Sequence, residues 1–355
     1  MPAAGPKSGS LVALGTTLLS AFRFPIPMSL LQVSYAPTLQ TVARALAAAF
    51  PESQPAEHEA PLETTAPSTQ PTRLLSADVI EGRELRGIAV PGEPEVGLEA
   101  FLDGMQKSEV IRYVRGVPVI WGTVGAVIRD RRERRLHTWR HVVEHRLYAP
   151  RTQVSDAEWE LLGRAGYPLT DSSTAAGGEP ASEHPLALRE AVVHRVQQDR
   201  KRAEQRLAVA WCDAEDRRLM VDGGISDSDP VARSSAAIGV VKSHRALYVS
   251  GAALAVVLAL RERERSSAFL VSPERRASVV SWYLRIRDPR GRDPMWGLIR
   301  VEMASGPKGA ELTRRADEVS RWILAEVAPV SLPDGRWHTM LYGVRDCEEF
   351  LRAIT

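Results

Sequence analysis

The chain has 355 residues, of which 44% are hydrophobic and 25% are charged, so it can bury a substantial core and is typical of a globular protein. Its formal net charge of +2 gives no overall signal for nucleic-acid binding. Cys212 and Cys347 lack metal-ligand spacing and give no indication of a disulfide framework, which fits a reducing cytoplasm. The longest apolar runs are shorter than the roughly 20 residues that a membrane helix needs. We therefore expect a cytoplasmic protein without a membrane segment.

Composition changes divide the chain into three parts. Residues 1–50 are rich in Ala and Leu, and a helix is predicted near residues 41–46. Residues 51–75 are rich in Pro, Glu, Thr and Ser, which is typical of a flexible linker that cannot bury enough apolar surface to order itself. Residues 76–355 are expected to form the folded domain.

The folded part begins with predicted strands. The run at residues 96–104 is partly apolar and ends in Asp103-Gly104. Residues 114–128 place β-branched side chains between glycines, which predicts strands and hairpins. Residues 136–147 are predicted to be helical, and residues 170–180 to form a loop.

The second half alternates predicted helices and strands. Residues 186–210 contain no Gly or Pro and form the strongest predicted helix. Further helices are expected at 311–327 and 342–354, and strands at 219–222, 237–242, 279–286 and 298–303. Strands mixed with long helices indicate an α/β fold.

Two segments share one sequence pattern, an apolar strand that ends in Asp-Gly. Phe101-Leu102-Asp103-Gly104 and Met220-Val221-Asp222-Gly223 each place an aspartate where an apolar strand meets a glycine. A strand holds a carboxylate rigidly, and glycine lets a cation or phosphate approach the backbone closely. Such oxygen ligands suit hard divalent cations. The alternative interpretation is that each Asp-Gly pair is a turn.

A third carboxylate could come from the long helix. Glu190 and Glu204 are nearly four turns apart and could share a face of it. Either one could instead be a solvated helix charge paired with a nearby arginine.

Three other features allow more than one interpretation. His137, His141 and His145 would share a face of a helix and could bind Zn²⁺, although packing or phosphate contact is favoured. Four tryptophans lie in the last quarter of the chain, and packing in the core is favoured for them over a platform on which bases stack. Three arginine-rich clusters could be solvated faces or could line a phosphate-binding groove. The tryptophans are Trp282, Trp296, Trp322 and Trp337, and the clusters span 129–135, 195–206 and 285–292.

The order of these motifs resembles that of the NurA nuclease family. Its most specific part is Val221-Asp222-Gly223 followed by Gly239-Val240-Val241-Lys242-Ser243. The resemblance covers roughly residues 95–355 and implies a ribonuclease H-like core, in which a mixed β-sheet is flanked by helices. It also implies a deoxyribonuclease that uses Mn²⁺ or Mg²⁺, forms a homodimer, and works with a HerA-type hexameric ATPase in DNA end processing.

The same resemblance implies roles for particular residues. Asp103, Glu204 and Asp222 would bind the metal, and Lys242 would lie near the scissile phosphate. His338 and Tyr342 are candidates for a further active-site group. Met105 stands where the family more usually has a small hydroxyl residue, so a catalytically weak scaffold that docks on a ring ATPase and channels DNA is the alternative.

Overall fold

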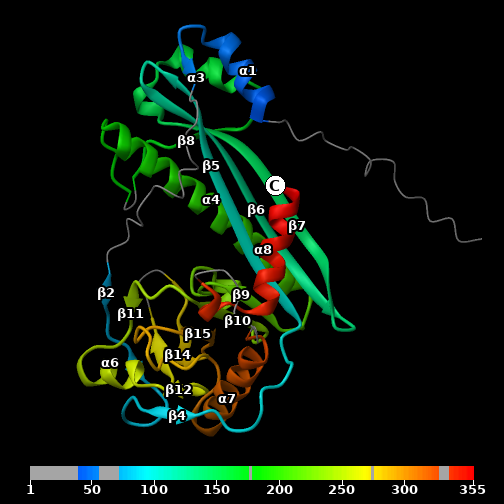
Figure 1. Ribbon diagram of the computed structural model, residues 1–355, viewed down its shortest axis with the longest axis vertical. Helices are drawn as coiled ribbons and strands as arrows, with labels where there is room; N and C mark the ends of the chain where they lie inside the picture. Colours follow the sequence, from blue (N-terminus) through cyan, green and yellow to red (C-terminus); the bar gives the residue numbers. More distant parts are fainter. Residues whose placement is uncertain (1–38, 56–71, 176–177, 273–275, 328–335) are drawn as a thin grey trace, which may run out of the picture. The chain divides into compact units, whose positions relative to one another are not determined.

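One mixed sheet organises the folded part of the chain, which we describe from a computed structural model (Figure 1). The structure describes residues 39–55, 72–175, 178–272, 276–327 and 336–355. These residues belong to a single unit, Leu39–Thr355. The expected extension and linker, residues 1–50 and 51–75, therefore fall largely outside the described residues.

The centre of the sheet is built from five strands. β5 (Ala100–Val114), β6 (Val117–Arg132) and β7 (Arg135–Ala149) form an antiparallel meander. β9 (Leu219–Asp222) lies parallel to β5 on its other side, and β10 (Ala237–Val241) lies parallel to β9. In the order β7-β6-β5-β9-β10, β6 alone runs antiparallel to the other strands, so the centre of the sheet is mixed.

Antiparallel strands extend the sheet beyond β10. β15 (Leu298–Ala304) pairs with β10, and β14 (Val279–Arg285) pairs with β15. Every residue of β14 is buried, as in a strand covered on both faces. Short strands complete the sheet: β1 (Gln54–Pro55), β3 (Asp78–Val79), β4 (Gly87–Ala89), β8 (Leu169–Asp171), β12 (Glu264–Ser266) and β13 (Phe269–Val271). β2 (Arg73–Leu74) and β11 (Ala246–Leu247) pair separately.

Helices cover both faces of the sheet. α4 (Pro185–Ala214), α5 (Asp229–Arg233) and α6 (Gly251–Leu258) pack with Leu102 and its neighbours on one face. α7 (Gly309–Ala325) and α8 (Tyr342–Ile354) pack with Phe101 and its neighbours on the other. Successive side chains of a strand point to opposite faces, so these two core clusters lie on opposite sides of β5. The helix-flanked mixed sheet confirms the predicted fold class.

The far ends of β5, β6 and β7 carry a smaller core. α1 (Leu39–Ala49) and α3 (Asp156–Gly163) pack there, with Val42, Leu46 and Leu162 buried. Ser155 and Glu158 form a capping box that begins α3. The helix expected near residues 41–46 is α1, and it packs against the sheet. The described residues also include two 3₁₀ turns, η2 (Arg151–Gln153) and η3 (Trp337–Thr339).

Most of the predicted helices and strands are confirmed, but one prediction is wrong. The helices expected at 186–210, 311–327 and 342–354 are α4, α7 and α8. Residues 136–147, expected to be helical, instead lie in β7 and pair with β6 along its length. Within the described residues, none of the helices is long and apolar enough to cross a bilayer.

Candidate active site

Asp103 and Asp222 lie at the point where the β5–β9 ladder ends. The last paired residues are Leu102 and Val221, so each aspartate is the next residue on its strand. β9 ends at Asp222, whereas β5 continues past Asp103 because β6 pairs with it for its whole length. Asp103 is only 5% exposed, and its carboxylate Oδ1 accepts a 2.7 Å hydrogen bond from the Gly104 N–H. The sheet therefore places both carboxylates together.

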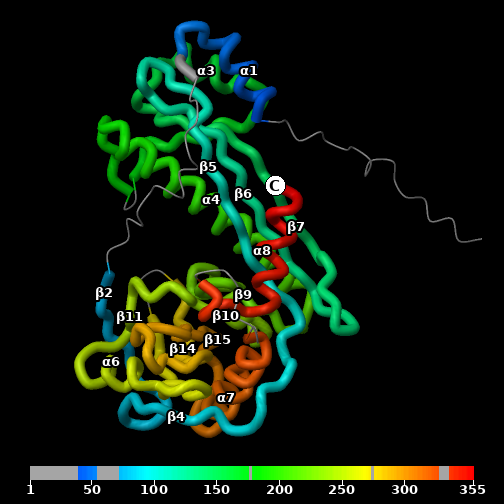
Figure 2. The backbone as a smooth tube through the Cα atoms, viewed as in Figure 1, coloured from blue at the N-terminus to red at the C-terminus, as the bar shows by residue number. Residues whose placement is uncertain are grey.

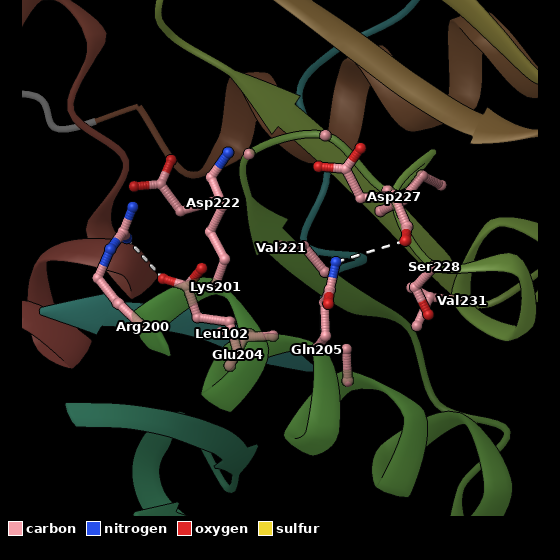
Figure 3. Close-up of a pocket in the computed structure, with 14 residues that line it drawn as sticks. Leu102, Arg200, Lys201, Glu204, Gln205, Val221, Asp222, Asp227, Ser228 and Val231 are labelled. Atoms are coloured by element: carbon pink, nitrogen blue, oxygen red, sulfur yellow. Dashed lines mark hydrogen bonds and ion pairs between the residues drawn. The ribbon is translucent and has the colours of Figure 1, made fainter. Parts of the chain in front are cut away.

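Glu204 reaches the same point from α4. A Cβ atom added at Gly104 would lie 2.3 Å from Glu204 Oε1, so the glycine makes room for the carboxylate. Arg200, one turn earlier on α4, forms a 2.6 Å ion pair with Glu204 and donates a 3.3 Å hydrogen bond to the Gly104 carbonyl. Figure 3 shows the Glu204 and Asp222 carboxylates on the same side of the pocket, with Arg200 and Lys201 beside them.

The three carboxylates influence one another electrostatically. Burial, followed by the charges of Asp222 and Glu204, raises the pKa of Asp103 well above its usual value, and Lys242 opposes the rise. Burial also raises the pKa of Glu204, with Asp222 adding to the rise and Arg200 and Lys201 opposing it. The cluster thus concentrates negative charge in a mostly buried place, where bound cations would be favoured.

Lys242 contacts this cluster directly. Val240 pairs with Asp222 in the β9–β10 register, and Lys242 follows two residues later. Its Nζ lies 2.9 Å from Asp222 Oδ1, and both side chains are 22% exposed. The structure thus brings Asp103, Glu204, Asp222 and Lys242 together.

Glu302 supports the loop that follows Asp222, and sequence reasoning did not identify it. It lies on β15, is 1% exposed, and accepts a 2.7 Å hydrogen bond from the Ile225 N–H. Arg300 donates to its other oxygen at 2.6 Å. A Cβ at Gly224 would lie 3.0 Å from Glu302, so this glycine lets the loop pack on the carboxylate. Arg300 and Glu302, two residues apart on a predicted strand, were the available signal.

Two pockets flank Asp222. One, of 190 Å³, lies on the α4 side, and Arg200, Lys201, Glu204 and Asp222 are among its lining residues (Figure 3). The other, of 340 Å³, lies on the α8 side and is lined by Asp222, Lys242, His338 and residues of α8. An extended substrate lying across Asp222 would have space on both sides.

The two C-terminal candidates have different surroundings. His338 lies in η3 and lines the α8-side pocket together with Asp222 and Lys242. Tyr342 begins α8, is 60% exposed, and does not line either pocket. Its backbone N–H donates to the Glu326 carbonyl. Of the two, His338 is therefore the residue placed beside the carboxylates.

The donor set suits a hard divalent cation in its chemistry. Asp103, Glu204 and Asp222 supply only carboxylate oxygens, the ligands that Mg²⁺ and Mn²⁺ prefer, and Asp222 is close enough to raise the pKa of both Asp103 and Glu204. In the described part of the chain, however, no three His, Cys, Asp or Glu side chains are close enough to hold one ion. Arg200 and Lys242 instead neutralise two of the carboxylates.

Other predicted features lie outside this site. His141 and His145 are on β7, where they contact the aromatic rings of Phe350 and Trp121. A zinc site formed with His137 is not present among the described residues.

Trp282 and Trp322 are buried in the core, as favoured, whereas Trp296 and Trp337 are partly exposed and contact each other. Several cluster arginines form ion pairs, including Arg129, Arg131, Arg132, Arg202 and Arg206.

Comparison with solved structures finds a likeness to the crystal structure of the NurA nuclease from Sulfolobus solfataricus. The two share 11% sequence identity, with a TM-score of 0.44, over 78% of this chain and 81% of that one. No family model and no curated protein match the chain. The function is therefore inferred from this chain's own side chains.

Proposed function

We propose that this chain is a metal-dependent deoxyribonuclease that hydrolyses phosphodiester bonds at Asp103, Glu204 and Asp222. The observation that carries the proposal is the convergence of these carboxylates from β5, α4 and β9 beside Lys242. A buried cluster of like charges is unfavourable alone and is typical of a site that binds cations. The pockets on both sides of Asp222 suit an extended substrate.

Each residue of the site has a separate task in this proposal. Asp103, Glu204 and Asp222 would supply the carboxylate oxygens for Mn²⁺ or Mg²⁺ and would have to draw closer together around the ion than they lie in its absence. The ion, when bound, supplies Lewis-acid stabilisation of the phosphate. Lys242, whose Nζ lies 2.9 Å from Asp222, would contact a phosphate oxygen and offset the charge that develops during hydrolysis. Arg200 orients Glu204 through their ion pair.

The proposal predicts that cleavage depends on both aspartates and on a divalent cation. We expect the native chain to degrade linear DNA with Mn²⁺ or Mg²⁺ but not with EDTA. Asp103→Asn and Asp222→Asn should each lower the cleavage rate by about 100-fold or more, because each removes several kcal/mol of transition-state stabilisation. The assay uses end-labelled single- and double-stranded DNA, resolved on denaturing gels.

Asp156→Asn is the matched control, because Asp156 is 90% exposed on α3 and pairs with Arg151 away from the site. Cleavage that persists unchanged in both site variants would refute the metal site. Absence of cleavage by the native chain, with and without a HerA-type ATPase, would favour the alternative of a DNA-binding scaffold. The ATPase partner and the homodimer remain predictions from the sequence resemblance.

A further inference from the structure

β15 carries a buried pair of opposite charges behind the loop that follows Asp222. Glu302 and Arg300 are 1% and 7% exposed and form a 2.6 Å ion pair. They are two residues apart on one strand, so both side chains lie on the same face of the sheet. Apolar side chains of similar volume often stabilise a core as well as a buried ion pair does. The contacts that the pair makes therefore explain its presence better than stability does.

The Glu302 carboxylate holds the backbone of the Asp222 loop, which we define as residues 223–225. Its Oε2 accepts a 2.7 Å hydrogen bond from the Ile225 N–H, and Ile225 is itself only 2% exposed. A buried N–H needs an acceptor, because leaving it unpaired is unfavourable. The carboxylate therefore fixes the backbone three residues after Asp222.

The Asp222 loop also lies directly against β10. A Cβ at Gly239 would lie 2.8 Å from the Gly223 carbonyl oxygen and 3.3 Å from Ile225 Cγ2. The Gly223 N–H donates a 2.9 Å hydrogen bond to a carbonyl of β10. β10 and β15 together thus determine the path of the backbone that leaves Asp222.

Arg300 connects the same strand to the segment that follows Lys242. Its guanidinium lies 4.8 Å from the centre of the Tyr248 ring and donates a 3.2 Å hydrogen bond to Ser281 Oγ. The charged pair therefore contacts the segments that follow both Asp222 and Lys242. Those two residues form the 2.9 Å ion pair of the candidate site.

We infer that Glu302 is a positioning residue, which sets the place of the Asp222 carboxylate through the Asp222 loop, with Arg300 as its fixed partner. Glu302 is not among the residues that line either pocket beside Asp222, so it acts through the loop. The inference rests on the proposed function, because it concerns how the chain holds one of the proposed metal ligands. Removing a group that orients a metal ligand commonly lowers metal affinity or activity by about 10–100-fold.

Two double variants separate the hydrogen bond from the ion pair. The glutamine double variant is Arg300→Met with Glu302→Gln, and the methionine double variant is Arg300→Met with Glu302→Met. Both lack the buried charges, so neither leaves an arginine unpaired, but only the glutamine double variant keeps an acceptor for the Ile225 N–H. The methionine double variant should bind Mn²⁺ about tenfold more weakly than the glutamine one or weaker still, and the glutamine one should stay within about threefold of the native chain. Binding is measured without DNA, from the loss of the electron paramagnetic resonance signal of free Mn²⁺.

Gly239→Ala disturbs the same loop without changing the charged pair. The added methyl group would lie 2.8 Å from the Gly223 carbonyl oxygen, a backbone atom that cannot turn aside, so the backbone next to Asp222 must shift. Mn²⁺ affinity should again fall by about tenfold or more. Hydrogen exchange, followed by mass spectrometry on peptides that cover residues 219–230, should be faster in Gly239→Ala and in the methionine double variant than in the native chain. The glutamine double variant should exchange like the native chain.

Arg131→Met with Glu326→Met is the matched control. It removes another 2.6 Å ion pair with a buried carboxylate, but between β6 and the C-terminal end of α7. This variant should keep native Mn²⁺ affinity whatever happens to its urea midpoint. At saturating Mn²⁺, the methionine double variant should lower kcat for DNA cleavage about tenfold and change KM less than about twofold, because its defect lies in the metal ligand and not in the contacts with DNA.

Equal Mn²⁺ affinity in the glutamine and methionine double variants would overturn the inference, and so would native affinity and native exchange in Gly239→Ala. If the methionine double variant did not fold, Gly239→Ala would decide alone. Failure of the proposed function would look different, because the native chain itself would then bind no Mn²⁺ and cleave no DNA. In that case the exchange rates of residues 219–230 would still show whether Glu302 holds the Asp222 loop.

Discussion

At the scale of single residues, Gly104 has a role different from the expected one. The sequence suggested that the glycine after Asp103 lets a cation or phosphate approach the backbone. In the structure the space above Gly104 is occupied by Glu204, whose Oε1 would lie 2.3 Å from an added Cβ. Gly104 therefore determines where a helix-borne carboxylate stands relative to Asp103 and Asp222.

Gly104→Ala should therefore impair catalysis much more than folding. The new methyl group meets the end of a flexible side chain, so Glu204 can move aside and unfolding free energy should change by no more than about 1 kcal/mol. A carboxylate displaced by about 1 Å can cost on the order of 100-fold in rate. Cleavage kinetics and urea unfolding, measured on the same preparation, check the prediction. A variant with native activity would show that the position of Glu204 is unimportant.

The sequence predicted those site residues that belong to local motifs. Asp103, Asp222 and Lys242 each lie within or directly after an apolar strand, and that context is visible in the sequence. Glu204 was less certain, because Glu190 on the same helix was an equal candidate by spacing. Glu302 was missed, since its role depends on the distant Ile225 N–H, which only the folded chain brings near.

At the scale of elements, the β-meander shows how tertiary pairing overrides local pattern. Residues 136–147 lack strict alternation of polar and apolar side chains, because most of β7 is only partly buried. Even spacing alone would place His137, His141 and His145 on one face of a strand as well as of a helix, but the register shift between Ile128 and Arg129 separates His137 from the other two. β5 likewise continues through Asp103-Gly104, where a turn was a plausible alternative, because β6 pairs with both residues.

Gly343 lets α8 approach β5 closely. Gly343, in the first turn of α8, faces the ring of the fully buried Phe101, and an added Cβ would lie 2.3 Å from ring carbons. The ring has no room to turn away, so Gly343→Ala must shift the helix. We expect a loss of about 1–3 kcal/mol in unfolding free energy, seen as a lower urea midpoint.

Gly163→Ala is the control for this substitution. Gly163 ends α3, and a Cβ there would meet nothing within 4 Å. Alanine is the better helix former, so this variant should be as stable as the native chain or slightly more stable. Equal midpoints for both alanine variants would show that the Gly343–Phe101 contact does not set the position of α8.

At the scale of the whole molecule, the net charge is nearly balanced at +2, but three carboxylates, those of Asp103, Glu204 and Asp222, lie together in one place. The charge of Asp222 raises the pKa of both Asp103 and Glu204, in addition to the rise that burial causes. Holding like charges together opposes folding. Lys242 and Arg200 offset part of this unfavourable repulsion without removing it. A bound cation would therefore stabilise the folded chain further.

Mn²⁺ or Mg²⁺ should accordingly raise the melting temperature of the full chain. A ligand that binds only the folded state at 100 times its Kd adds about 2.7 kcal/mol of stability, which corresponds to a rise of several degrees in a chain of this size. Differential scanning fluorimetry with MnCl₂, against NaCl at equal ionic strength, measures the rise. Without metal, Asp222→Asn should melt at the same temperature as the native chain or at a higher one, because the variant lacks one of the repelling charges. With metal, its melting temperature should rise much less than that of the native chain. A rise of the same size in Asp222→Asn and the native chain would place the cation elsewhere. Because this measurement needs no DNA, it separates metal binding from catalysis.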